Sequence, residues 1–575
     1  MGALAIARGR TAGGQRMALL TAAKRTAPPT ARAERIVARC LPSIGDLLFV
    51  CVLFTVLFGL QGRLLGYDGD SGWHIRIGEY TLAHGLPRTE VLLATSFGQA
   101  HIYYEWLGEL VYGVADRLGG LNGVVALVSV LVALASAELF AAFRRRGLSA
   151  LPALALTLLA LPLTAVTWTA RAQLFTLVLA LWWSERLWRY WRDGNARRLW
   201  ALPPAMALWA NLHGGFIVGV LLLATTTAVA WLLPSARAKS SPKALAFALG
   251  AVLAATLITP WGLGLPQHIL GFLSDPLISR YTAEFQSPDF HTALPLLFLA
   301  LAGALVGLWI WLAARGAPPD PLAIAHAAVW TALTLYSVRY VAIWALIILP
   351  LLANALVVAV PYLSEAPVAT STKLTRRLRR WLAGVASVSR RMDVVDALVG
   401  RGIWTALAIL VVLLTVARGG VLPGAATRTL NASYDAQVFP VQAVERLRAQ
   451  GLPTGVGFNT YTWGGYLDYA LPAHRGFIDS RSDEYGEALL ADYLTITHLA
   501  LGWQQVLDHY AVAWALLPRA EPLAQALALL PAWQCTPADE QGVAVLCTRS
   551  RVAAAVWAQA PLRTGAQRGS SAWPS

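Results

Sequence analysis

The sequence predicts a mainly α-helical, polytopic membrane protein, and three observations predict it. Of its 575 residues 57% are hydrophobic and only 13% are charged, whereas soluble domains carry about 25% charged residues. Long apolar runs such as 44–60, 124–140 and 403–417 suit helices that need roughly 20 residues to cross a membrane. Basic clusters separate these runs and give a net charge of +15. We therefore expect about eleven transmembrane helices, with Lys and Arg collected in cytoplasmic loops.

The charge pattern also predicts a topology. The first 43 residues are basic and Ala-rich, so we expect a disordered cytoplasmic tail, an exiting helix at 44–60 and a large outer loop at 61–120. Every strongly basic loop then falls inside if the later helices alternate. The short apolar run at 199–212, which contains two prolines, must cross the membrane as well. Without this crossing, every later loop would lie on the opposite side of the membrane. The later helices are expected at 121–143, 148–168, 173–187, 199–212, 216–233, 244–258, 296–313, 322–336, 341–360 and 403–417.

This topology divides the chain into five parts. A transmembrane domain at 44–361 follows the tail. A basic cytoplasmic loop covers 362–401, and the last helix lies within 402–419. The remainder, 420–575, alternates helical patterns with short strand-like runs, which indicates a small extracytoplasmic α/β domain.

The cysteines fit an exported C-terminal domain. The chain has four of them and no CxxC pattern, so the sequence shows no zinc or redox motif. Cys535 and Cys547 flank a polar turn and could pair across a hairpin if the domain lies in an oxidising compartment. The alternative is two reduced thiols in the core.

The positive charge of the chain belongs to the tail and the inner loops, so nucleic acid is not an expected partner.

The unusual polar residues converge on the outer face of this topology. Polar groups near membrane depth are costly and indicate function, and acids beside arginines on one face indicate an anion site. Around 73–80 and 107–114, apolar residues recur at helical spacing, which predicts two helices lying in the membrane interface. Each polar residue also has a structural reading, as a solvated turn, a turn-bonding histidine or a snorkelling arginine. The residues are Asp68, Asp70, His74, Glu105, Arg171, Asn211, His213, Glu284 and Arg339.

Several motifs resemble a bacterial multi-spanning family related to the glycosyltransferase C superfamily, which includes protein O-mannosyltransferases and aminoarabinose transferases. The resemblance covers most of the chain from about residue 44. This chain departs from the family pattern at Tyr104, Ala172 and Ser480, where the family has His, Pro and Gly. The motifs are Asp68-Gly69-Asp70-Ser71-Gly72-Trp73-His74, Gly78, Pro87-Arg88-Thr89, Tyr104-Glu105-Trp106-Leu107, Arg171-Ala172-Gln173, Asn211-Leu212-His213-Gly214-Gly215, Trp463-Gly464-Gly465-Tyr466-Leu467 and Phe477-Ile478-Asp479-Ser480-Arg481.

The resemblance implies an enzyme that moves a sugar from a polyprenyl-phosphate-linked donor in the cell membrane to an extracytoplasmic glycan, lipid or protein acceptor. It implies that an outer-loop acid serves as general base or binds a metal, and it leaves a divalent metal cofactor open. The chemistry agrees, since an acceptor hydroxyl must lose a proton and a departing phosphate needs cations.

Each residue therefore receives an expected role. Asp68 or Asp70 is the proposed base, Glu105 a second acid, and His213 an assisting group. The proposed substrate-binding residues are Arg171, Arg339, His74, Asn211 and Glu284. Two competing readings are a transporter or flippase for lipid-linked glycans, which would need water access from both faces, and an assembly protein that works through its outer domain.

The topology predicts the outcome of reporter fusions. Fusions after residues 147 and 390 should report the cytoplasm, and a fusion after residue 430 should report the outside, because the basic loops hold their helix ends inside. An outer signal at 390 or an inner signal at 430 would refute this map.

Overall fold

The computed structural model of the protein consists of two compact units. The helical unit contains Met1–Thr89 and Ala100–Ser433, and the α/β unit contains Glu90–Gln99 and Tyr434–Ser575. The sequence boundary at 420 thus lies before the start of the second compact unit, which also takes in ten residues of the first loop. The structure describes residues 38–67, 69–234, 239–274, 283–364, 373–481 and 486–550.

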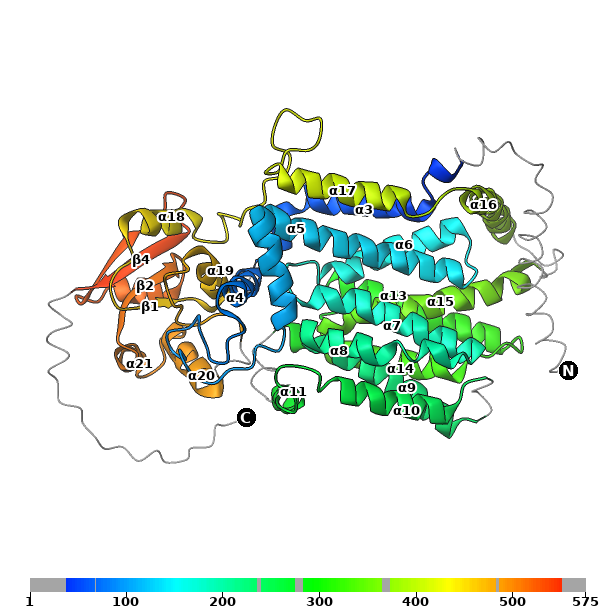
Figure 1. Ribbon diagram of the computed structural model, residues 1–575, viewed down its shortest axis with the longest axis horizontal. Coiled ribbons are helices and arrows are strands. Elements are labelled where there is room, and N and C mark those ends of the chain that lie inside the picture. The colour runs from blue at the N-terminus through cyan, green and yellow to red at the C-terminus, as the bar shows by residue number, and fades with distance from the viewer. Residues whose placement is uncertain are drawn as a thin grey trace. The chain divides into compact units, whose positions relative to one another are not determined.

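Each of the eleven segments expected to cross the membrane contains a helix, and these helices run side by side as a bundle (Figure 1). Pro242 and Pro321 begin two of them at the first turn, where a missing N–H costs nothing. The helices are α3 (Ile44–Gly59), α5 (Trp106–Arg145), α6 (Ala150–Ala165), α7 (Gln173–Asp193), α8 (Leu202–Leu212), α9 (Ile217–Leu232), α10 (Pro242–Ala255), α13 (Ala293–Ala313), α14 (Pro321–Tyr336), α15 (Val341–Ser364) and α17 (Ile403–Ala417).

The length and apolar composition of several helices indicate a membrane protein. Within the described ranges five helices are long and apolar enough to cross a membrane, or six if one bent pair forms a single span. Three further apolar helices, α6, α10 and α14, are shorter. A mainly helical bundle is therefore established, while eleven crossings remain an expectation from the charge pattern.

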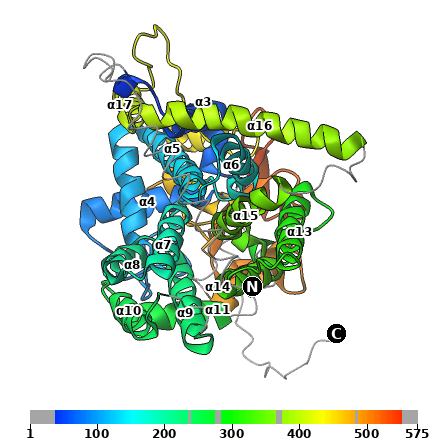
Figure 2. The same cartoon turned by 90° about the vertical axis from the view of Figure 1, so that its right-hand side faces the viewer.

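Helical elements also lie across one end of the bundle. Figures 1 and 2 show α4 (Asp70–His84) and the first part of α5 crossing the direction of the bundle helices, and α5 turns at Gly120, where φ is 59°. The two elements touch through glycine, since a Cβ on Gly78 would lie 2.0 Å from the Glu109 carbonyl oxygen. Near the bundle ends lie α11 (Gly264–Ser274) and the short 3₁₀ helices η1 (Gln61–Leu65), η2 (Ala196–Arg198), η3 (Gly214–Phe216), η4 (Ala283–Phe285) and η5 (Val338–Tyr340).

The α/β unit is built on one four-stranded sheet with the order β1-β2-β4-β3. The strands β1 and β2 are parallel, and the other two pairs are antiparallel. Cys535 and Cys547 face each other in the β3–β4 register and form a disulfide, with Cα atoms 4.0 Å apart. The elements are α18 (Val441–Gln450), β1 (Val456–Asn459), α19 (Tyr461–Ala470), α20 (Gly486–Thr497), α21 (Trp503–His509), β2 (Val512–Pro518), α22 (Pro522–Ala528), β3 (Trp533–Pro537) and β4 (Ala544–Arg549).

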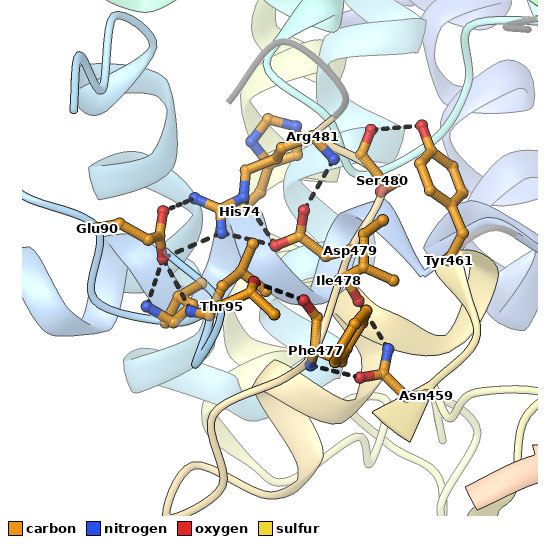
Figure 3. A network of polar contacts seen from close by, with 12 residues as sticks. His74, Glu90, Thr95, Asn459, Tyr461, Phe477, Ile478, Asp479, Ser480 and Arg481 are labelled. Carbon is orange, nitrogen blue, oxygen red and sulfur yellow. Dashed lines mark hydrogen bonds and ion pairs between the residues drawn. The ribbon is translucent and has the colours of Figure 1, made fainter. Parts of the chain in front are cut away.

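A buried ion-pair network joins the loop segment 90–99 to the rest of the α/β unit (Figure 3). Arg481 Nη1 lies 3.0 Å from Glu90 Oε2, and Arg481 Nε donates to Asp479 Oδ2 at 2.8 Å. These side chains are at most 3% exposed. Thr95 Oγ1 also donates to the Phe477 carbonyl oxygen at 2.8 Å. Because a segment of the first loop lies inside this unit, that loop and the C-terminal region lie on the same side of the membrane.

The network carries more acid than base. Burial, and then the nearby Asp479 charge, raises the pKa of Asp468 well above its usual range. Burial also raises the pKa of Asp479, although the Arg481 guanidinium opposes that rise. Arg481 is therefore the cation that makes the burial of Glu90 and Asp479 tolerable.

We predict that Arg481→Met destabilises the α/β unit by about 3–5 kcal/mol, because two buried carboxylates lose their cation. The thermal midpoint and the protease resistance of this unit in the purified full chain would measure the effect. Arg446→Met is the matched control, since Arg446 is exposed and its pair with Glu540 should contribute less than about 1 kcal/mol. Equal stability of the two variants would contradict the assignment.

Candidate functional site

A charged cluster lies around Arg171, in the turn before α7. Arg171 Nη2 is 2.8 Å from Asp70 Oδ2, and Arg171 Nη1 is 3.0 Å from Glu284 Oε1. Asp70 begins α4, and Glu284 lies in η4 before α13. The side chains of Asp70 and Arg171 are each 13% exposed, while that of Glu284 is 44% exposed. The fold thus brings three segments that are remote in sequence onto one guanidinium.

Backbone contacts hold these segments in place. Ala170 N donates to the Leu64 carbonyl oxygen at 2.7 Å, and the Tyr112 hydroxyl donates to the Arg171 carbonyl oxygen at 2.9 Å. The Ser337 hydroxyl donates to the Glu284 carbonyl oxygen at 2.8 Å. Arg171 and Glu284 are therefore fixed through their own main chain or a neighbour's, which preorganises this part of the cluster.

Arg339 places a second cation near the cluster. It lies in η5, and its guanidinium carbon is 4.9 Å from the centroid of the Phe285 ring. Burial raises the pKa of Glu284, but the charges of Arg171 and Arg339 outweigh it, so this pKa is lower than usual and the carboxylate is ionised at neutral pH. An open cavity of about 460 Å³ lies beside them, lined by Phe285, Gln286, Ser287 and Tyr336.

His213 is a neutral hydrogen-bond donor in this environment. Its Nδ1 accepts from Gly215 N at 2.8 Å and lies 2.8 Å from the Thr176 hydroxyl, which itself accepts from Trp209 Nε1 at 2.9 Å. The ring proton must therefore be on Nε2, which is 3.4 Å from Glu105 Oε1. Burial, and then the charge of Arg339, lowers the pKa of His213 to about 3.

The other expected site residues lie in different contacts. His74 Nδ1 is 3.9 Å from Glu109 Oε1, and both side chains are buried between α4 and α5. The Asn211 side chain in α8 accepts from Trp106 Nε1 at 2.8 Å and donates to the Ile258 carbonyl oxygen at 2.8 Å, so it ties α8 to the start of α5 and to the segment after α10. Asp68 lies outside the described residues.

Glu109 is a buried acid that was not among the expected site residues. It follows Glu105 by four residues, and this spacing places both on one face of α5. That spacing was the available signal in the sequence.

A divalent metal does not fit the described part of this cluster. No group of three or more His, Cys, Asp or Glu side chains there could hold a metal ion. The carboxylates of Asp70 and Glu284 contact a guanidinium instead.

Comparisons with known proteins give structural similarities only. No family model and no curated protein matches the chain. ArnT from Cupriavidus metallidurans in the apo state is 20% identical with a TM-score of 0.47, covering 87% of this chain and 97% of that chain. The Archaeoglobus fulgidus oligosaccharyltransferase in the apo form is 12% identical with a TM-score of 0.47, covering 82% and 69%. Archaeoglobus fulgidus AglB in complex with an inhibitory peptide and a dolichol-phosphate is 12% identical with a TM-score of 0.45, covering 90% and 74%.

The low pKa of His213 predicts a pH-dependent stability. In the unfolded chain the His213 imidazole has a pKa of about 6.5, and in the folded chain its pKa is about 3. Between these two pH values only the unfolded chain binds a proton at His213, so the free energy of unfolding falls as the pH drops from 6.5 toward 3. Between pH 6.5 and 5 the loss is about 2 kcal/mol. We predict that His213→Gln loses this part of the pH dependence.

Thermal midpoints at pH 7 and pH 5 would measure the difference between wild type and variant. His291→Gln is the matched control, because the His291 side chain is 96% exposed. An acid-induced loss that is the same in His213→Gln and wild type would contradict a buried neutral His213.

Proposed function

We propose that the chain is a membrane glycosyltransferase that moves a sugar from a polyprenyl-phosphate-linked donor to an acceptor on the outer face of the cell membrane. The observation that carries the proposal is the position of Arg171 between Asp70 and Glu284, with Arg339 close enough to act on the same carboxylate. In the expected topology the N-terminus is cytoplasmic, and the cluster and the α/β unit are extracytoplasmic.

The two arginines suit a phosphate at the membrane surface. A guanidinium binds phosphate and carboxylate with the same bidentate geometry, so a donor phosphate can take the place that a carboxylate holds on Arg171. Arg339 adds a cation beside the open cavity, which gives the ligand room. As the sugar leaves the lipid phosphate, both cations stabilise the charge that develops on the phosphate oxygens.

Phosphate binding would also activate the base. Asp70 is bonded to Arg171 in the structure, and a carboxylate in that ion pair is a weak base. When a phosphate binds Arg171 in place of the Asp70 carboxylate, Asp70 is free to face the acceptor. Asp70 then accepts the hydroxyl proton, the acceptor oxygen bonds to the anomeric carbon, and the bond from that carbon to the phosphate oxygen breaks. The lipid phosphate leaves with the electron pair and stays on the arginines.

Two further acids have places in this proposal. Asp68 is the alternative base from the same loop. Glu105, which faces the Nε2–H of neutral His213, is a second carboxylate that can orient the acceptor. His213 itself holds the turn at Gly215 and does not exchange a proton near neutral pH, because its pKa is about 3.

We predict that Asp70→Asn lowers turnover by roughly 10²–10⁴-fold with a smaller change in donor binding, because the base acts on the acceptor. Arg339→Ala should mainly weaken donor binding, since its charge contacts phosphate before and during transfer. The assay supplies a labelled polyprenyl-phosphate sugar and candidate acceptors to the purified chain. Asp289→Asn is the matched control, because this acid is exposed beside His291, outside the cluster.

The same assay separates the alternatives. Full activity in Asp70→Asn and loss in Asp68→Asn would move the base to Asp68, and full activity in both would refute an outer-loop aspartate base. A transporter or flippase would show no transfer in the purified wild type, and cluster variants of both kinds would share a translocation defect.

A further inference from the structure

A long helix in the basic segment before the last span lies across the bundle. This helix, α16 (Lys373–Leu398), crosses the ends of the bundle helices in Figure 2. Its part Ala383–Leu398 is inclined by 75° to α17. Because α17 runs with the bundle, α16 lies near the plane of the membrane when the bundle crosses it.

One side of α16 is fixed to the bundle through helix caps. Asp393 Oδ1 accepts from Ala150 N at 3.0 Å, and Ser389 Oγ accepts from Leu151 N at 3.0 Å. Asp396 Oδ1 accepts from Ile44 N at 2.7 Å. The first N–H groups of a helix have no partner in that helix, so α16 supplies the missing acceptors to α6 and α3. Its depth is therefore that of the ends of two membrane helices.

The remaining surface of α16 has an apolar face and a basic face, and Val394 and Leu398, 52% and 61% exposed, lie among the arginines of the basic face. The apolar face carries Trp381 and Val388, which lie seven residues apart and are 64% and 51% exposed. The half-buried side chains of Val385 and Met392 lie on the same face. The basic face carries arginines that are exposed and that make no hydrogen bond or ion pair with the described residues. These are Arg380, Arg390 and Arg391.

We propose that α16 is a membrane-surface helix that binds anionic phospholipid. Its apolar face enters the boundary between headgroups and acyl chains, and its arginines contact lipid phosphates. An amphipathic helix with apolar residues on one face and Arg on the other is the form that lies in a bilayer interface. The ligand follows from charge complementarity, since both acids of α16, Asp393 and Asp396, already accept from bundle N–H groups.

Two probe positions on opposite faces test the orientation. Full-length protein with Cys40→Ser and Cys51→Ser receives one new cysteine, Val388→Cys or Arg390→Cys, and carries a polarity-sensitive fluorophore in phosphatidylcholine nanodiscs containing phosphatidylglycerol. We expect lipid-borne nitroxide to quench the label at 388 and aqueous iodide to quench the label at 390. Iodide quenching of both labels with no nitroxide effect would overturn the proposal and indicate a water-exposed face for a soluble partner.

Lipid selectivity tests the arginines independently. The association of spin-labelled phosphatidylglycerol, relative to phosphatidylcholine, should fall by roughly five-fold for each arginine replaced in Arg380→Gln/Arg390→Gln/Arg391→Gln. The matched control removes three exposed arginines of the α/β unit, Arg446→Gln/Arg475→Gln/Arg519→Gln. An equal change in both triple variants would overturn the assignment of the lipid to α16.

Discussion

The ion pairs of Arg171 are the interaction on which one end of the helical unit depends. A buried charge that loses its partner is strongly unfavourable, and Asp70 and Arg171 are both largely buried. The contact of Arg171 with Glu284 joins residues 113 positions apart. The beginning of α4, the turn before α7 and the segment before α13 must therefore meet, whatever the loops between them do. In the proposed function, this cluster is the part of the chain that binds the phosphate of the donor.

The other end of the bundle uses acids differently. Asp46, Asp393 and Asp396 accept hydrogen bonds from the first N–H groups of α17, α6 and α3, and so replace the partners that helix starts lack. Asp46 is also bonded to the Thr405 hydroxyl at 2.7 Å. At this end some carboxylates thus bond backbone N–H groups, and Asp393 and Glu185 also pair with arginines of the segment 144–146.

The sequence predicted the helices well because apolar length and basic flanks act locally. Each of the eleven segments contains a helix, and alternation across the bundle correctly brought Asp70 and Arg171 to one end. It did not reveal that Asp70 is already bonded to Arg171, so in the proposed mechanism the donor must release Asp70 before it can act as a base. The ion pair between Glu90 and Arg481 joins residues 391 positions apart, and no periodic pattern in the sequence predicts it. The helix α16 was hidden because its many basic residues obscure the apolar spacing at 381, 385, 388 and 392.

The central claim is that Arg171 exchanges a carboxylate for the phosphate of a lipid-linked sugar. A structure of the full chain in a bilayer with a polyprenyl-phosphate sugar tests it most directly. The account predicts that the phosphate lies within hydrogen-bond distance of Arg171 and Arg339, and that Asp70 has left Arg171 and faces the space from which the acceptor hydroxyl approaches the anomeric carbon. A donor phosphate bound elsewhere, with the pairs from Arg171 to Asp70 and Glu284 intact, would contradict it.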